Sequence, residues 1–204
     1  MIDLKIEGGM WTVTLNRPEK ANSLTKAMLA ELATIATRAG VEGARVFVLT
    51  GAGRVFSAGA DLDEARAGLA TDPVWEQLST AIAALPCLTI AALNGTLAGG
   101  AMGMALACDL RLAVPGAKVF YPVMKLGFLP QPSDPARLVA LVGPARAKMI
   151  LMGGAKVSTE DAASWGLLDR IVEDDLLVEV GLLAADALAA TTTHVAAIKR
   201  MIDA

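Results

Sequence analysis

The 204-residue sequence is poor in several residue types, and each scarcity excludes a class of protein. Its single histidine, His194, excludes a polyhistidine metal site and any mechanism that needs two histidines. Its two cysteines, Cys87 and Cys108, make a disulfide scaffold a poor explanation and fit a reducing cytosol, so we expect a cytoplasmic protein. The net charge of −3 excludes a generally basic surface, so we expect no nucleic-acid partner.

Asp, Glu, Lys, Arg and His are all missing from one long stretch, Gln77 to Cys108. An unbroken apolar run of that length would be a candidate membrane span. This stretch is interrupted by Pro86, Asn94-Gly95 and Gly99-Gly100, which favour buried turns over one continuous helix. The N-terminus, Met1 to Lys5, lacks the basic-then-apolar pattern of a signal peptide. We therefore expect no membrane partner.

Hydrophobic residues are abundant, at 54%, and the length favours a single domain over 1–204 with a proper core. Hydrophobic periodicity and turn residues predict alternating strands and helices, followed by a mostly helical second half. The predicted strands are 4–7, 10–15, 45–50, 88–93, 110–114 and 169–172. The predicted helices are 25–38, 72–85, 99–107, 135–142, 145–152, 159–165, 175–190 and 193–202. This order indicates an α/β domain with helices appended at its C-terminal end.

Glycine loops after strands raise the hypothesis of nucleotide binding. The segment 51–56 begins like a dinucleotide fingerprint, but Phe56 stands where the third glycine belongs. A phosphate loop ending in Gly-Lys-Ser/Thr is absent from the sequence. Ser57 does not form a Gly-x-Ser-x-Gly elbow, because Val55 occupies the first glycine position. A nucleotide-binding oxidoreductase is therefore the weaker alternative.

Two junctions, Phe56 to Leu62 and Asn94 to Ala101, carry more information. Each follows a buried β run and precedes a helix, so free backbone N–H groups point outward there. Their glycines and alanines let a ligand approach the backbone closely. Two such N–H groups converging on one carbonyl oxygen would form an oxyanion hole, each contributing on the order of 3 kcal/mol. The alternative is that small residues only permit tight packing of helix on sheet.

Short segments in a fixed order extend this pattern along nearly the whole chain. They are LNRPEKANSL at 15–24, VLTGAG at 48–53, FSAGADL at 56–62, IAALNG at 90–95, Gly99-Gly100, ACDLR at 107–111, Leu126-Gly127 with Pro130, Val142-Gly143, and Ala162 with Gly166-Leu167. Together they resemble the crotonase, or enoyl-CoA hydratase/isomerase, superfamily. The resemblance implies a ClpP/crotonase-like α/β fold of repeated β-β-α turns with C-terminal helices. It implies an acyl-CoA-binding spiral core over 1–150 and a helical part over 151–204, shortened at the C-terminus.

The resemblance also implies a substrate and an assembly. An acyl-CoA thioester would bind with its carbonyl polarised by the backbone N–H groups of Ala60 and Gly100, which would stabilise an enolate. The adenine and pantetheine of CoA would lie along Lys20, Ala21, Ala58, Asp61 and Leu62. Further cations that could meet its phosphates are Lys26, Arg54 and Lys199. No metal or redox cofactor is implied, coenzyme A being part of the substrate, and the expected assembly is a homotrimer or hexamer.

The chain departs from the hydratases at their two catalytic glutamates, whose positions hold Gly103 and Val123. Neither residue can transfer a proton, which argues against ordinary two-glutamate hydration. The remaining candidates are Glu76, on a predicted helix, and Gln131, eight residues beyond the second position. Asp134 is expected to cap a helix. The hypotheses left open are a non-catalytic acyl-CoA-binding scaffold, a CoA-thioester hydrolase or decarboxylase, and an isomerase with an unusual base.

Overall fold

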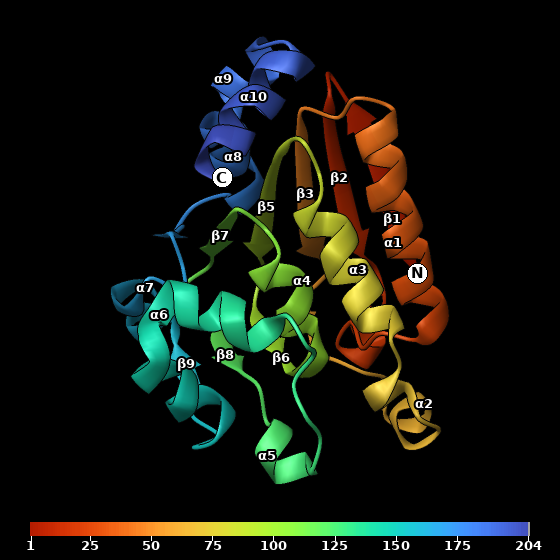
Figure 1. Cartoon of the computed structure of the whole chain (residues 1–204), viewed down its shortest axis with the longest axis vertical. Coiled ribbons are helices and arrows are strands. Elements are labelled where there is room, and N and C mark those ends of the chain that lie inside the picture. Colours follow the sequence, from red (N-terminus) through yellow and green to blue (C-terminus); the bar gives the residue numbers. More distant parts are fainter. Residues whose placement is uncertain (204) are drawn as a thin grey trace.

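A computed structural model describes residues 1–203 as two β-sheets with helices around them (Figure 1). The larger sheet has the strand order β1-β2-β3-β5-β7-β10, and the smaller has the order β4-β6-β8-β9. The strands are β1 (Ile2–Glu7), β2 (Met10–Leu15), β3 (Val46–Gly51), β4 (Val55–Ser57), β5 (Leu88–Leu93), β6 (Thr96–Ala98), β7 (Leu110–Ala113), β8 (Lys118–Phe120), β9 (Val157–Ser158) and β10 (Arg170–Ile171).

Most helices follow the strands as the sequence predicts, but the short helices at 62–66 and 123–126 were not predicted. The α-helices are α1 (Lys26–Val41), α2 (Leu62–Arg66), α3 (Val74–Ala83), α4 (Met102–Leu106), α5 (Val123–Leu126), α6 (Asp134–Leu151), α7 (Thr159–Trp165), α8 (Leu176–Leu183), α9 (Ala185–Ala189) and α10 (Thr192–Ile202). Single 3₁₀ turns are η1 (Pro18–Lys20), η2 (Leu69–Thr71) and η3 (Gly99–Ala101).

The larger sheet begins with a hairpin whose turn is made by two glycines. Gly8 and Gly9 have φ angles of +53° and +87°, which suit a two-residue turn between antiparallel strands. β1 pairs antiparallel with β2, and the sheet then continues in parallel through β3, β5, β7 and β10. Parallel neighbours need crossover connections, and α1 and α3 supply two of them.

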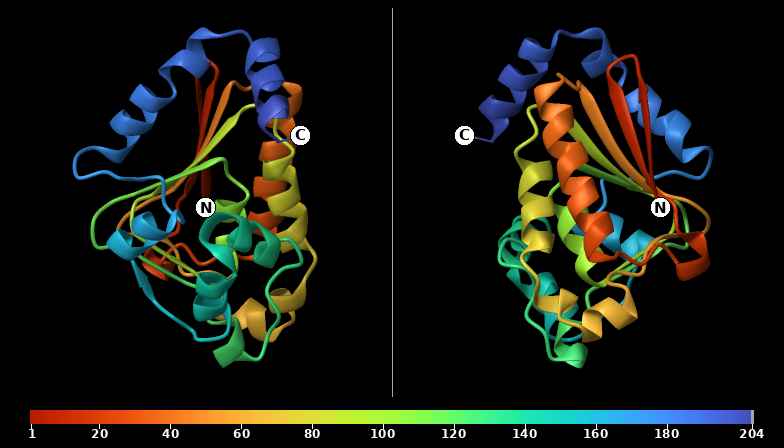
Figure 2. Two further views of the ribbon diagram at one scale, coloured as in Figure 1. Left: turned by 60° about the vertical axis from the view of Figure 1, so that its left-hand side comes forward. Right: turned by 90° about the vertical axis from the view of Figure 1, so that its right-hand side faces the viewer.

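Both faces of the larger sheet are buried, as the apolar runs of its central strands require. Along β3, Phe47 and Leu49 belong to one hydrophobic cluster, whereas Val46 and Val48 belong to another. The first cluster includes side chains of α1 and α3, and the second includes those of α8. Figure 2 shows α1 and α3 on one side of the sheet and α8 on the other, so the sheet is the middle of three layers.

The smaller sheet is the part that the sequence pattern did not predict, because its strands are only two or three residues long. β4, β6 and β8 pair in parallel, and β9 joins β8 antiparallel. The pairs β3–β4, β5–β6 and β7–β8 each give one strand to each sheet before a helix follows. The chain therefore repeats a β-β-α turn, and the crotonase-like α/β fold is confirmed.

Four predicted helices differ in detail from the observed ones. The two expected at 135–142 and 145–152 form the single element α6, interrupted at Gly143, whose φ is +77°. Pro144 follows and cannot donate a backbone hydrogen bond, which explains the interruption. The helix expected at 175–190 divides at Ala184 into α8 and α9. The helix expected at 99–107 starts as the 3₁₀ turn η3 and continues as α4.

The uncharged stretch from Gln77 to Cys108 folds into separate elements, as its turn residues indicate. It forms the second half of α3, then β5, β6, η3 and α4. Within residues 1–203, no helix combines the length and apolar composition that a membrane crossing requires.

Arg111, on β7, connects this strand to the segment that follows α7. Its hydrogen bonds allow a test of stability. The buried guanidinium donates to the backbone oxygens of three residues and to the Asp169 carboxylate at 3.0 Å. Arg111→Met leaves these acceptors without a donor, so we expect the free energy of unfolding to fall by about 3 kcal/mol. Urea denaturation measures the change. Arg66→Met removes an exposed ion pair and should change it by less than about 0.5 kcal/mol; equal losses would contradict the assignment.

Candidate active site

The turns that follow β4 and β6 touch each other. Because β4 and β6 pair in parallel, the chain leaves both strands at the same edge of the smaller sheet. Gly59, with φ of +91°, has no room for a side chain: a Cβ there would lie 2.9 Å from the Ala98 oxygen and 3.3 Å from the Gly100 nitrogen. The residue after Gly59 is Ala60, so the two predicted N–H donors lie on backbones that are in contact.

Neither of these donors is used by the fold. Leu24 bridges to the first turn: its N–H donates to the Gly59 oxygen at 2.8 Å, and its oxygen accepts from the Asp61 N–H at 2.9 Å. In this bridge the N–H of Ala60 has no partner, and that of Gly100 makes no hydrogen bond to any group within residues 1–203. Both residues are partly exposed. The two N–H groups are therefore available to a ligand.

Ser57 and Asn22 hold the first turn in place, a role that the sequence reasoning missed. The fully buried Ser57 hydroxyl donates to the Asn22 oxygen at 2.8 Å and accepts from the Gly59 N–H at 3.1 Å. The Asn22 side chain donates to the oxygens of Ala52 and Val55 at 2.9 and 2.7 Å. The sequence signal that could have indicated this role is a serine among small residues. These bonds fix the direction of the Ala60 N–H.

Asn94 joins the connection between β5 and β6 to the connection between β3 and β4, on the chain before the two turns. Its side-chain oxygen accepts from the Gly51 N–H at 2.9 Å, and its amide donates to the Gly53 oxygen at 3.0 Å. Beyond it, the Trp75 ring packs over Gly100, where an added Cβ would meet ring carbons at 3.2 Å. Trp75 is itself fixed by donating from Nε1 to the Leu69 oxygen at 2.8 Å. One side of Gly100 is thus walled by an aromatic ring.

The residues predicted along CoA lie around the first turn. Ala58 donates its N–H to the Ala21 oxygen at 3.0 Å, which joins these two, and Lys20 beside Ala21 is exposed. Asp61 accepts from Arg17 at 2.8 Å and caps α2. That bond from Arg17 holds the pKa of the Asp61 carboxyl below its usual value. Leu62 is 73% exposed at the start of α2. Their contact with CoA stays a prediction.

Of the further cations considered for phosphate binding, Lys199 lies at the wrong end of the sheet. Its ammonium donates to the Cys87 oxygen at 3.0 Å and to Asp109 at 2.8 Å, near the start of β5. Gly100 follows the other end of that strand. Lys26 pairs with Asp72 at 2.7 Å, near α2. Lys199 is therefore a structural cation of the α10 attachment.

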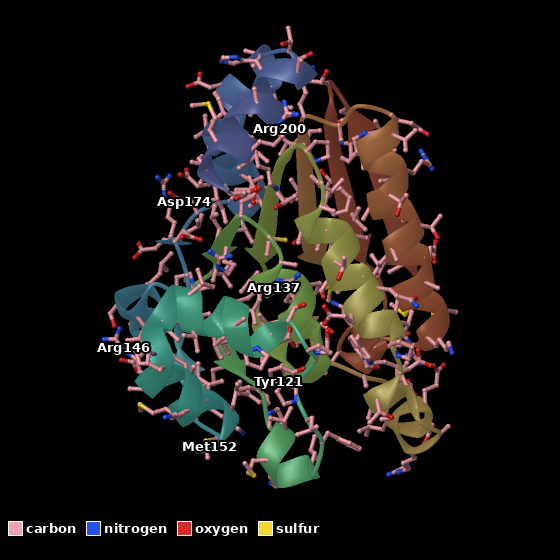
Figure 3. The ribbon with its side chains drawn as sticks, in the orientation of Figure 1. Tyr121, Arg137, Arg146, Met152, Asp174 and Arg200 are labelled. Carbon is pink, nitrogen blue, oxygen red and sulfur yellow. The ribbon has the colours of Figure 1, made fainter. Side chains whose placement is uncertain are left out.

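Behind Gly100 lies a polar cluster that includes Gln131. The Gln131 amide donates to the Gly100 oxygen at 3.0 Å and approaches the hydroxyl of Tyr121, the only tyrosine in the sequence, at 3.5 Å. Tyr121 and Arg137 are both labelled in Figure 3, where they lie on the side of the molecule on which α6 passes α4. Burial raises the pKa of the Tyr121 hydroxyl. Gln131 is thus in direct contact with a predicted N–H donor residue.

Asp134 does not cap α6, so that expectation is wrong. Its carboxyl has no exposed surface, and neither oxygen has a hydrogen-bond partner of normal geometry within residues 1–203. Burial raises its pKa to about 7, and the nearby Tyr121 hydroxyl and Arg137 only partly offset that effect. The sequence signal favoured a cap because Pro135 suits the first turn of a helix, but the side chain turns inward.

Glu76, predicted as a proton-transfer group, is held by the loop before α6. Its carboxylate accepts a short hydrogen bond from the Ser133 hydroxyl, another from the Ser133 N–H at 3.2 Å, and one from Thr80 at 3.4 Å. Burial acts to raise the pKa of Glu76, but the bonds from Ser133, together with Arg137 and Thr80, outweigh it, so the pKa lies below its usual value. Its catalytic role stays a prediction.

Neither position of the two hydratase glutamates holds a residue that can act as an acid or a base. Gly103 lies in α4 and Val123 begins α5, and both are buried. Among residues 1–203, no group of three or more His, Cys, Asp or Glu side chains could hold a metal ion. Burial raises the pKa of both cysteine thiols to about 12, so the thiols stay protonated. The chemistry must come from other groups.

Sequence and structure comparisons place this arrangement among known proteins. The profile of the enoyl-CoA hydratase/isomerase family matches residues 5–204. The chain is 33% identical over 198 residues to the 1,2-epoxyphenylacetyl-CoA isomerase of Escherichia coli K12, covering 92% of this chain and 76% of the relative. The crystal structure of an enoyl-CoA hydratase from Mycobacterium avium subsp. paratuberculosis superposes with a TM-score of 0.89 at 31% identity, covering 99% of this chain and 80% of that one.

A second solved structure, of an enoyl-CoA hydratase/carnitine racemase from Magnetospirillum magneticum, has a TM-score of 0.87 at 32% identity, covering 98% of this chain and 80% of that one. The fold and the two apposed turns therefore define a crotonase-like protein. Within that class, the chain belongs to the enoyl-CoA hydratase/isomerase family, whose members are enzymes that bind acyl-CoA substrates.

The contact between the two turns can be tested at Gly59. Gly59→Ala forces the Ala98 backbone away, so we expect binding of a CoA thioester to weaken more than tenfold, measured by calorimetry. Gly68→Ala is the matched control, because Gly68 also has a positive φ, of +109°, but an added Cβ meets nothing within 4 Å. Both variants should lose about 1–2 kcal/mol of stability from backbone strain, and only Gly59→Ala should lose binding. Equal binding by both would contradict the role of the contact.

Proposed function

We propose that the protein binds an acyl-CoA thioester and polarises its carbonyl with the backbone N–H groups of Ala60 and Gly100, so that an enolate is stabilised. The observation that carries this proposal is the pair of unused, partly exposed donors on two turns in contact. Donors that are already oriented need no reorganisation when negative charge develops on the thioester oxygen. Backbone donors also cannot titrate, so this contribution does not depend on pH.

The CoA moiety, in this proposal, follows the edge formed by η1 and the turn after β4. Lys20, Ala21, Ala58, Asp61 and Leu62 line that edge and lead toward Ala60. The small side chains of Ala21 and Ala58 leave the backbone accessible to the pantetheine. Lys20, Lys26 and Arg54 are the cations that we expect to meet its phosphates. No metal or redox cofactor takes part.

The reaction proposed is proton transfer beside the polarised thioester, and not hydration by two glutamates. Gly103 and Val123 supply no carboxyl for positioning and deprotonating a water. A CoA-thioester hydrolase or decarboxylase, and a non-catalytic acyl-CoA-binding scaffold, are the competing functions. Incubating the protein with saturated, enoyl and malonyl-type CoA esters, with mass spectrometry of the products, separates all four.

The hydration step has its own expected outcome. Crotonyl-CoA should be hydrated about 10²–10⁴-fold more slowly than by the Mycobacterium avium hydratase measured beside it, the range that a missing acid–base pair accounts for. Loss of absorbance of the conjugated enoyl thioester measures the rate. Hydration at a comparable rate would show that other groups activate water here.

The donor role of Gly100 can be isolated with two substitutions. Gly100→Pro removes the N–H, and Gly100→Ala keeps it while adding the same first side-chain carbon against Trp75. We expect Gly100→Pro to slow exchange of the α-protons of butanoyl-CoA with D₂O by about 10²–10³ relative to Gly100→Ala. Circular dichroism checks folding. If the two variants exchange equally, the N–H of Gly100 is not a donor to the substrate.

The assembly proposed is a homotrimer, or a hexamer of two trimers, in the cytoplasm. Large apolar side chains remain uncovered on the C-terminal helices of the single chain: Leu182 is 68% exposed, Met201 80% and Ile202 76%. Such a surface favours contact with a second copy. Light scattering after size-exclusion chromatography gives the number of subunits.

A further inference from the structure

The space next to Gly103, where a side chain is missing, is filled by two polar groups from another element. A Cβ on Gly103 would lie 2.5 Å from the Gln131 side-chain oxygen and 3.0 Å from Asp134 Oδ1. Gly103 therefore could not carry even a methyl group without displacing them. The glycine and the buried carboxyl at Asp134 are two halves of one packing arrangement between α4 and α6.

This cluster contains several buried polar atoms with no partner. The side-chain oxygen of Gln131, both carboxyl oxygens of Asp134 and Nη1 of Arg137 make no hydrogen bond of normal geometry within residues 1–203, although the Tyr121 hydroxyl lies close to the Asp134 carboxyl. Buried polar atoms are nearly always paired in folded proteins, because leaving one unpaired is costly. Four such atoms in one place, beside a residue that offers a free N–H donor, indicate a site that is completed by a ligand.

The cluster lies next to the proposed oxyanion donors. Gly100 and Gly103 are three residues apart on one helical turn, roughly 5 Å along its axis, and so share a face. The Gln131 amide links the cluster to the Gly100 oxygen at 3.0 Å. The Asp134 carboxyl therefore lies about one helical turn from Gly100, on the side where Gly103 lacks a side chain.

We propose that Asp134 is the catalytic acid/base of this protein, acting on the α-carbon of the bound acyl-CoA in place of the two absent glutamates. This inference rests on the proposed function. The Asp134 carboxylate takes a proton from the α-carbon, and the C–H electron pair becomes the carbon–carbon double bond of the enolate. The charge moves to the thioester oxygen, which Ala60 and Gly100 hold. Return of the proton from Asp134 to carbon restores a neutral thioester.

Contact with substrate requires a movement of Gln131. Asp134 has no exposed surface, whereas Gln131 is partly exposed and covers the same space. The acyl group reaches the carboxyl when the Gln131 side chain turns aside and gives up its bonds to Gly100 and Tyr121. The amide itself takes no proton.

The surroundings of Asp134 suit a base that works near neutral pH. Burial raises its pKa to about 7; the Tyr121 hydroxyl and Arg137 act against this, and the negative Glu76 on α3 adds to it. α4, the other helix packed there, carries no charged residue. Because the ionised form is the base, the rate of proton removal should rise with pH and level off above about 7.

The experiment measures exchange of the α-protons of butanoyl-CoA with D₂O by mass spectrometry, for the full chain and three variants. We expect Asp134→Asn to reduce exchange at least 100-fold and remove its pH dependence. Asp175→Asn is the matched control, since Asp175 also stands at a helix start but caps α8; it should exchange like the parent protein. Glu76→Gln should keep exchange dependent on pH, with a midpoint at lower pH, because the charge of Glu76 no longer raises the pKa of Asp134. Loss of exchange in Glu76→Gln with retention in Asp134→Asn would overturn the assignment.

A separate readout distinguishes this inference from the proposed function. The absorption of bound cinnamoyl-CoA shifts to longer wavelength when its carbonyl is polarised. Asp134→Asn should keep that shift, whereas Gly100→Pro should lose it. Absence of the shift in the parent protein contradicts the oxyanion hole itself. A normal shift combined with undiminished exchange in Asp134→Asn contradicts only the role of Asp134.

Stability provides a control for folding that is independent of activity. A carboxyl whose pKa is raised on folding, from 3.8 to about 7, stabilises the protein fully below pH 3.8, and this contribution is lost as pH rises through 7. Asparagine cannot ionise. Relative to the parent, Asp134→Asn should therefore gain in urea midpoint between about pH 4 and pH 8. If Asp134→Asn is more resistant to urea but exchanges no protons, it has lost its catalytic group while it remains folded.

Discussion

The contact between the backbones of Gly59 and Gly99-Gly100 is the constraint on which the rest of this molecule depends. It requires glycine at two positions of positive φ, short parallel strands that end together, and buried side chains that hold each turn. The larger sheet and its two helical layers give β4 and β6 a rigid base. If the two turns separated, the N–H groups of Ala60 and Gly100 could not act as the proposed pair of donors to one oxygen atom.

Much of the fold was predictable from hydrophobic pattern, because the long central strands and amphipathic helices carry strong periodic signals. The smaller sheet was not, since β4 and β6 are only three residues long and owe their pairing to neighbouring strands. At the site, glycine-rich turns predicted where free N–H groups lie. The inward direction of Asp134 was not predictable, because Pro135 gives the same local signal whether the preceding carboxyl caps the helix or is buried.

The departures from the hydratase pattern are connected in space although they are far apart in sequence. Considered alone, Gly103 indicates only that a catalytic glutamate of the hydratases is absent. In the folded chain, the absence of a side chain at Gly103 leaves room for Gln131 and for the carboxyl of Asp134, which lies on α6. An aspartate buried without partners lowers stability, which is a common property of functional sites.

The Trp75 ring beside Gly100 links the proposed reaction site to η2, a segment that lies outside the two turns. Trp75 packs its ring over Gly100 and is anchored through Nε1 to the Leu69 oxygen in η2. The position of the ring is thus set by the short connection between α2 and α3, and not by the elements that carry the N–H donors. Insertions or deletions in that connection can alter the room left for an acyl chain without disturbing the donors. Under the proposed function, a change in this connection would alter which acyl groups fit without altering the N–H donors or Asp134.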